Sequence, residues 1–322
     1  MKALLVSVTL VCGAPWTVAA QQVLVPPVIG TVEPYSYTSA VLSGPSSSLH
    51  VVDEHRLRRP GATFLQIEFK EVVLSPESVL EIEGKGGDKQ IYEVDTWNPQ
   101  VPHSVYFNGD EVTVRLWAVK GAVGDRFSIR SIAVGSQPGV EPLSICGATD
   151  DRVLSSRKAI ARISVRTSTT VTWCSAWLAN VNNAFVTAGH CLSSPTLSLV
   201  TAQFNVPLST STGALVHPSA MDQFNWSGGG NWSYEDGGVG KDWGVFTTQQ
   251  NSTTRRHASP HQLDHFWTST STPVNDNGWV QGFGSRTSPA TYNAVGQYAR
   301  GPLVSRVGDV LRYFIDTTSG VP

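Results

Sequence analysis

Short segments that alternate apolar and polar residues restrict this chain to β structure. Five of them lie between residues 62 and 135: TFLQIEFKEVVL, SVLEIEG, QIYEVD, DEVTVRLWAV and RFSIRSIAV. Turns that contain Gly and Asp, such as KGGDK and FNGD, separate them, and long Glu/Lys/Ala/Leu runs are absent from the sequence. Because successive side chains of a strand point to opposite faces, the pattern predicts a small antiparallel β-sandwich over residues 61–136.

The first 20 residues, MKALLVSVTLVCGAPWTVAA, have the features of a secretory signal peptide. Lys2 precedes an apolar run that ends in small residues before Gln21, which is the usual order of such signals. Pro15 interrupts the run, and what remains is too short to cross a bilayer. We expect cleavage after Ala20 and a mature protein that is secreted, either extracellular or periplasmic.

The charge composition argues against several classes of partner. Charged residues make up 15% of the chain, against about 25% in typical domains. The 23 Lys and Arg residues nearly balance the 25 Asp and Glu residues, which leaves a net charge of −2. The sequence has no basic stripe and no later apolar segment of transmembrane length, so we expect neither a nucleic acid nor a membrane partner.

Three further segments complete the expected organisation. Residues 21–60 contain VPPVIG, GPSSS and HRLRRPG without a sustained period, which indicates an extended leader or linker. Residues 137–144 form a second expected linker. The sandwich between them has no cluster of chemically active side chains, so it is interpreted as an accessory domain, a pro-domain or a spacer. Residues 145–322 are then expected to contain the chemistry.

A histidine beside a cysteine is the main chemical signal of this last segment. Residues 174–192 are CSAWLANVNNAFVTAGHCL, in which two short β runs flank a VNN turn and predict a hairpin. A bridge between Cys174 and Cys191 would stabilise the fold by about 3 kcal/mol and would immobilise His190, as a general base requires. Taken alone, His190 fits a structural role better. Cys146 makes the cysteine count of the mature chain odd, which implies a free thiol, an intermolecular bridge or a missing partner.

The string T-A-G-H-C, preceded by a strand and by Cys174, resembles the active-site histidine segment of trypsin/chymotrypsin-like serine proteases. KDWGVF supplies the aspartate that this resemblance requires, Asp242, and the competing carboxylates Glu235 and Asp236 lie in a Gly-rich segment that is interpreted as a loop. WVQGFGS (279–285) and ICGATDDRVL (145–154) extend the likeness over residues 145–322.

The resemblance implies a chymotrypsin-like double β-barrel that hydrolyses peptide bonds with a Ser-His-Asp triad and without a cofactor. In that triad His190 is the general base and acid, and Asp242 orients it. The resemblance also implies that Cys174 and Cys191 are bonded and that Cys146 pairs with neither.

The last residues, DTTSGVP, align with the nucleophile motif D-T-T-G-G-x-S-G-S-P of the secreted bacterial members that the chain resembles. Asp316 and Gly320 match the motif, Ser319 replaces its first Gly, and Pro322 falls on the nucleophilic serine. Proline has neither a hydroxyl group nor an N–H, so both the nucleophile and the oxyanion-hole donor beside Gly320 are missing. We therefore expect a barrel that is incomplete at its C-terminus and a chain that is inactive as given. A truncated gene and a real loss of activity both remain open.

The same alignment places Asp316 at the base of the specificity pocket, which implies cleavage after basic residues. His257, His261 and His265 recur every four residues, but Pro260 weakens a helix there and no metal site is expected. The sequence thus predicts an all-β protein, with a β-sandwich followed by the incomplete double barrel. We expect a secreted, monomeric serine endopeptidase that acts on proteins or peptides. The alternative is an inactive protease homologue that serves as a binding protein.

Overall fold

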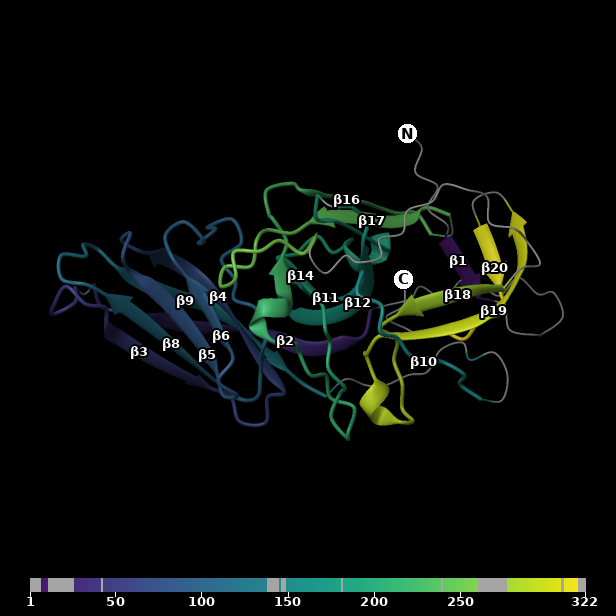
Figure 1. Ribbon diagram of the computed structural model, residues 1–322, viewed down its shortest axis with the longest axis horizontal. Helices are drawn as coiled ribbons and strands as arrows, with labels where there is room; N and C mark the ends of the chain where they lie inside the picture. Colours follow the sequence, from purple (N-terminus) through teal and green to yellow (C-terminus); the bar gives the residue numbers. More distant parts are fainter. Residues whose placement is uncertain are drawn as a thin grey trace.

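The computed structural model describes residues 7–10, 26–41, 43–137, 145, 149–180, 182–238, 240–259, 277–307 and 310–317. Within these ranges the protein is almost entirely β, with short 3₁₀ helices at Gly189–Cys191 (η1), Ala220–Asp222 (η2) and Ala290–Tyr292 (η4). Figure 1 shows three β regions along the long axis: a sandwich at one end, a curled sheet in the middle and a smaller sheet at the other end. The all-β fold class is therefore as predicted.

The N-terminal sandwich packs two sheets face to face. One sheet has the order β3-β8-β5-β6, with β3 at His50–Arg58, β8 at Glu111–Ala118, β5 at Val79–Gly84 and β6 at Lys89–Tyr92. The facing strands have the order β2-β9-β4-β7, with β2 at Val28–Thr38, β9 at Arg126–Gly135, β4 at Phe64–Val73 and β7 at Phe107–Asn108. Fully buried side chains such as Ile67, Leu80, Leu116 and Phe127 fill the space between them, which confirms the predicted sandwich.

The extended leader or linker predicted for residues 21–60 is wrong for the described part of that range, which contains β2 and β3. The charged residues of β3 obscured the alternation of apolar and polar residues by which a strand is recognised in the sequence. Its alternation is HVVDEHRLR, in which only Leu57 is buried. Arg56 and Arg58 form ion pairs with Glu111 and Asp110 at the start of β8. Charged side chains are typical of a strand at the edge of a sheet, where they discourage further pairing.

A curled sheet follows the sandwich and encloses a second hydrophobic core. Its strands succeed one another in the order β15 (Gln223–Asn225), β14 (Leu199–Gln203), β11 (Ile160–Arg166), β12 (Thr170–Leu178), β13 (Ala184–Thr187), β17 (Asp242–Thr247) and β16 (Trp232–Asp236). A bridge between Trp226 and Thr248 joins the chain just after β15 to the chain just after β17. Ile163, Phe185 and Phe246 are among the side chains buried inside the curl. This curled sheet agrees with the first of the two barrels that the sequence predicted.

The sandwich and the curled sheet share a strand, because β2 hydrogen-bonds to β9 on one side and to β12 on the other. One sheet therefore runs from the sandwich into the barrel (Figure 1). Arg166 of β11, with its side chain 1% exposed, reinforces the junction through Glu68 and Ser131 of the sandwich. A buried cation needs such partners, since desolvation without them is costly.

The third region is the smaller sheet at the C-terminal side of the chain. It contains β18 (Asn277–Gly282), β19 (Gln297–Val307), β10 (Val153–Leu154), β20 (Val310–Tyr313) and β1 (Ser7–Leu10). Ala299, Leu303, Tyr313 and Ile315 form its buried side. Strand β1, which pairs in parallel with β20, lies in the segment predicted as a signal peptide. The described part of the chain contains no helix with the length and apolarity needed to cross a bilayer.

Candidate active site

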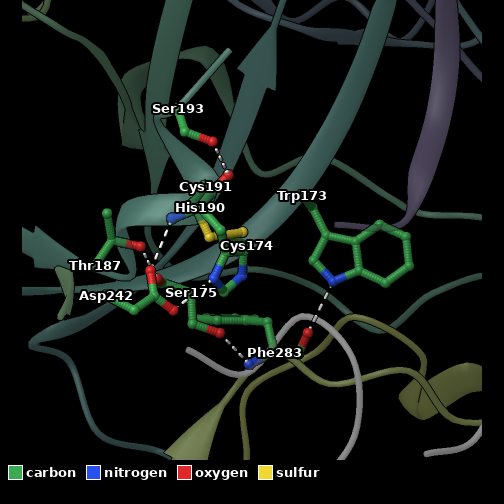
Figure 2. The surroundings of a disulfide bond; sticks show 9 residues. All are labelled: Trp173, Cys174, Ser175, Thr187, His190, Cys191, Ser193, Asp242 and Phe283. Carbon is green, nitrogen blue, oxygen red and sulfur yellow. Dashed lines mark hydrogen bonds and ion pairs between the residues drawn. A yellow bond between two sulfur atoms is a disulfide. The ribbon is translucent and has the colours of Figure 1, made fainter. Parts of the chain in front are cut away.

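The predicted hairpin and disulfide are both present. Strands β12 and β13 pair antiparallel through Trp177–Val186 and Leu178–Phe185, and a single residue, Ala188, separates β13 from η1. A disulfide joins Cys174 of β12 to Cys191 of η1, with 6.4 Å between their Cα atoms (Figure 2). The two elements are therefore linked covalently. The bond occupies both thiols, as expected, and Cys146 lies outside the described residues.

His190 and Asp242 meet beside this disulfide. The ring Nδ1 of His190 lies 2.7 Å from Oδ2 of Asp242, and the backbone N–H of His190 donates to Oδ1 at 2.8 Å. Figure 2 shows the carboxylate held between these two groups. The two side chains are 16% and 18% exposed, respectively. Asp242 is the first residue of β17, as the sequence predicted, so a strand end holds the carboxylate and a disulfide-tethered turn holds the imidazole.

The electrostatics of the pair define the tautomer of the histidine. Burial opposes ionisation of Asp242, but hydrogen bonds from the His190 ring and from the backbone N–H groups of His190 and Gly189 outweigh it, so the pKa of Asp242 is lowered. An ionised carboxylate only accepts hydrogen bonds, so Nδ1 of His190 carries the proton. Nε2 then presents its lone pair and can accept a proton from a hydroxyl group.

The close passage of β16 explains why a glycine precedes the histidine. A Cβ atom on Gly189 would lie 1.9 Å from the carbonyl oxygen of Glu235 and 2.8 Å from that of Trp243. Glu235 and Asp236 are thus not in a loop, as the sequence suggested, but in β16, which pairs with β17. The side chain of Glu235 is exposed and accepts a hydrogen bond from Nε1 of Trp243 at 3.0 Å.

A contact that the sequence analysis missed joins β12 to the third region. Nε1 of the fully buried Trp173 donates to the carbonyl oxygen of Phe283 at 2.8 Å, and the N–H of Phe283 donates to Oγ of Ser175 at 2.8 Å. Trp173 and Ser175 flank the disulfide residue Cys174 (Figure 2). The only available signal was the string W-C-S directly before the hairpin, which has no distinctive spacing.

Asp316 occupies a different environment. Asp316 is 4% exposed, and its Oδ2 accepts a hydrogen bond from the backbone N–H of Asp151 at 2.9 Å. Burial, together with the hydrogen bond and charge of Asp316, raises the pKa of Asp151. The structure therefore connects Asp316 to the segment that precedes β10.

The remaining candidates give no further site among the described residues. Gly320, Pro322, His261 and His265 fall outside the described residues. His257 is exposed, and its Nε2 lies 3.2 Å from Nε2 of Gln250. The ligand atoms of Cys174, His190 and Cys191 lie within 4.8 Å of one another. Thiolates bind metal ions, and these two sulfur atoms are instead consumed by the disulfide.

Comparison with known protein families and solved structures shows which proteins this chain is similar to. The family described as Trypsin matches residues 148–318, which is more than half of the chain. Among solved structures, a Glu endopeptidase in complex with MPD gives 15% identity and a TM-score of 0.40, over 55% of this chain and 79% of its own. The thermostable serine protease AL20 from an extremophilic microorganism gives 10% identity and a TM-score of 0.38, over 51% of this chain and 76% of its own.

The protease Anisep from Arthrobacter nicotinovorans gives 11% identity and a TM-score of 0.36, over 48% of this chain and 68% of its own. No curated protein sequence gives a significant match.

Proposed function

The chain belongs to the trypsin family of serine proteases, and we propose that it represents a secreted endopeptidase that hydrolyses peptide bonds through a Ser-His-Asp triad. The observation that carries this proposal is the 2.7 Å contact between His190 Nδ1 and Asp242 Oδ2 on two independently anchored elements. His190 takes the proton of the serine and returns it to the leaving amine, and Asp242 stabilises the imidazolium formed in between.

The nucleophile is the part of the triad that these residues do not supply. In the family motif the serine stands two positions after the glycine that aligns with Gly320, and this chain has Pro322 there. A proline cannot attack a carbonyl group, and its nitrogen carries no hydrogen for an oxyanion hole. Catalysis by this triad therefore requires a serine in place of Pro322, as in Gly-x-Ser-Gly at positions 320–323.

Labelling with a fluorophosphonate tests the proposal, because this reagent reacts only with an activated serine. Residues 21–322 should not be labelled. A longer version with Gly-x-Ser-Gly at 320–323 should be labelled and should hydrolyse peptide reporters. His190→Ala should abolish labelling in that version, whereas Lys120→Ala, at an exposed site of the sandwich, should preserve it. Labelling of residues 21–322 at Ser319 would contradict the placement of the nucleophile.

The second candidate function is a binding protein on a protease scaffold, and Pro322 is the observation that favours it. The two functions differ in what the longer version does. If it folds with an intact Cys174–Cys191 bond and is still not labelled, the His190–Asp242 pair is a structural remnant. In that case the binding function is the better conclusion.

For the form that carries a serine at position 322, we propose cleavage after Lys or Arg. Asp316 supports this, because its position in the motif corresponds to the base of the specificity pocket and its carboxylate is buried. A buried carboxylate favours a cationic partner. In the longer version, Asp316→Asn should reduce hydrolysis of Arg-terminated reporters more than Asp151→Asn does. Equal cleavage of Glu- and Arg-terminated reporters would refute this specificity.

Secretion is part of the same proposal. The signal-like residues 1–20 and the disulfide support it, since disulfides persist in oxidising compartments. Expression of residues 1–322 with fractionation of cells and medium should give a product that begins at Gln21 outside the cytoplasm. A cytoplasmic product that retains Met1 would contradict it.

A further inference from the structure

A small polar pocket lies on the outer face of the β18–β19 hairpin, apart from the His190–Asp242 pair. In the register of this hairpin, Trp279 is opposite Arg300 and Gln281 is opposite Tyr298. Opposed residues of an antiparallel pair point to the same face. The neighbouring pair Val280 and Ala299 points to the other face, into the buried cluster. The hairpin thus has one core face and one face that carries arginine and aromatic side chains.

The segment that follows β10 crosses this outer face and completes the pocket. Nε2 of Gln281 donates to Oγ of Ser155 at 2.5 Å, and the guanidinium of Arg157 lies 4.2 Å from the ring centroid of Trp279. The pocket between the segment and the hairpin has a volume of about 240 Å³. Its walls include Ser155, Arg157, Trp279, Tyr298 and Arg300. Two elements distant in sequence therefore contribute one arginine each.

The pocket is positively charged. Stacking on Trp279 holds the guanidinium of Arg157 at the wall of the pocket, and a guanidinium carries five N–H donors in its plane. Lys158 follows Arg157 and is exposed, as is Arg300. Across the part of the chain that the structure describes, no carboxylate lies within ion-pair distance of Lys158 or Arg300. For a protein with a net charge of −2, this is a local concentration of positive charge.

We propose that this pocket binds an acidic segment of a protein, with an Asp or Glu carboxylate between Arg157 and Arg300. Guanidinium groups only donate hydrogen bonds and match the two oxygens of a carboxylate in a planar pair. The hydroxyl groups of Ser155 and Tyr298 add donors at the same place. Trp279 and Leu154 are each 40% exposed at the rim and offer apolar contact to the neighbouring residues of the peptide.

The size of the pocket and its aromatic group favour a peptide over other anions. Its volume is below the roughly 300 Å³ at which small-molecule pockets begin, so it accommodates a side chain rather than a larger ligand. Single-stranded nucleic acids bind by stacking bases on aromatic faces, but Arg157 already stacks on Trp279. The site does not use His190 or Asp242, so the inference does not depend on the proposed catalytic activity.

Fluorescence anisotropy of a labelled peptide tests the inference on residues 21–322. The probe is a fluorescein-labelled dodecapeptide of alternating Glu and Gly, and its neutral control has Gln in place of Glu. The acidic peptide should bind and the Gln peptide should not. Arg157→Gln with Arg300→Gln should weaken binding at least tenfold. Trp279→Leu, which frees Arg157 from its stack, should weaken it several-fold.

The matched control removes two exposed lysines of the sandwich, Lys70→Gln with Lys120→Gln, and should change the affinity less than twofold. Circular dichroism and melting curves establish that each variant is folded. Equal binding by the double-arginine variant and the double-lysine control would overturn the inference, as would equal binding of the Gln peptide. Binding of a heparin hexasaccharide through the same arginines, without binding of the glutamate peptide, would also overturn it and favour a sulfated polysaccharide.

Discussion

Gly189 has no room for a side chain, so substitution at this position near the candidate site is restricted. Its missing side chain faces the backbone carbonyls of Glu235 and Trp243, and neither can rotate away as a flexible side chain would. Gly189→Ala must therefore displace η1 or β16, which overpacking data put at about 1–3 kcal/mol. We expect a lower melting temperature and, in the longer labelled version, slower fluorophosphonate reaction.

Gly86→Ala is the matched control for that change, since a Cβ atom at Gly86 meets nothing within 4 Å. It should leave the melting temperature and the labelling rate almost unchanged. An equal effect of the two substitutions would show that the contact between Gly189 and β16 is not the cause.

The carboxylate of Asp242 should make stability depend on acid pH. Because its pKa is lowered in the folded protein, its contribution is present above the unfolded pKa of about 3.9 and is lost as the pH falls through the folded pKa. Asp242→Asn should cost about 1–3 kcal/mol at pH 7, and the difference from the parent should shrink below about pH 4. Urea unfolding at several pH values measures the difference in the free energy of unfolding between the parent and Asp242→Asn. A difference that does not change with pH would contradict the assigned ionisation of Asp242.

At the scale of elements, the disulfide should matter more for the hairpin than for the whole barrel. It closes a loop between residues 17 positions apart, for which the chain-entropy model gives about 3 kcal/mol. Cys174→Ala with Cys191→Ala should lower the free energy of unfolding by that amount in denaturant titrations. Hydrogen exchange should accelerate at η1 more than at β14, whose residues are all buried. Uniform acceleration would contradict a local role.

The success of strand prediction depended on how each strand is buried. The segments in 62–135 alternate cleanly because one face of each packs on the sandwich core, and β4, β5, β8 and β9 fall where the pattern put them. Strand β2 was missed because its buried residues cluster at one end and Pro34 interrupts it. Its partners are set by tertiary contacts that no local pattern reports.

The same contrast holds for the candidate site. His190 and the disulfide were predictable because T-A-G-H-C and Cys174 form a dense local motif. Asp242, 52 residues further on, was predictable because the family resemblance requires an aspartate at the start of a later strand. The hydrogen bonds that join Trp173 and Ser175 to Phe283 were not predictable, since Phe283 contributes only its backbone C=O and N–H groups. Any residue type except proline could supply these groups at position 283.

On the scale of the whole molecule, the sandwich should behave as an integral part of the protein. The shared sheet through β2 and β12 and the burial of Arg166 against Glu68 both cross the junction. After cleavage at a protease site inserted within residues 138–144, the two fragments should co-elute in gel filtration and melt in one transition. Arg166→Ala should destabilise both parts together, by about 3–5 kcal/mol, because it leaves Glu68 without its buried partner. Separate elution of the fragments would identify the sandwich as a removable pro-domain.

The double pairing of β2 also has a consequence for the order in which the chain assembles during synthesis. Thr31 pairs with Val134 on one side and with Thr170 on the other. The sandwich strands leave the ribosome first, so β2 can join β9 while its second edge still lacks a partner. When β12 emerges, the free edge of β2 is already extended, and its N–H and C=O groups can pair with β12. The folded sandwich between the two strands also reduces the loop-closure entropy lost when they meet. The sandwich therefore acts as a template on which the hairpin that carries His190 takes its register.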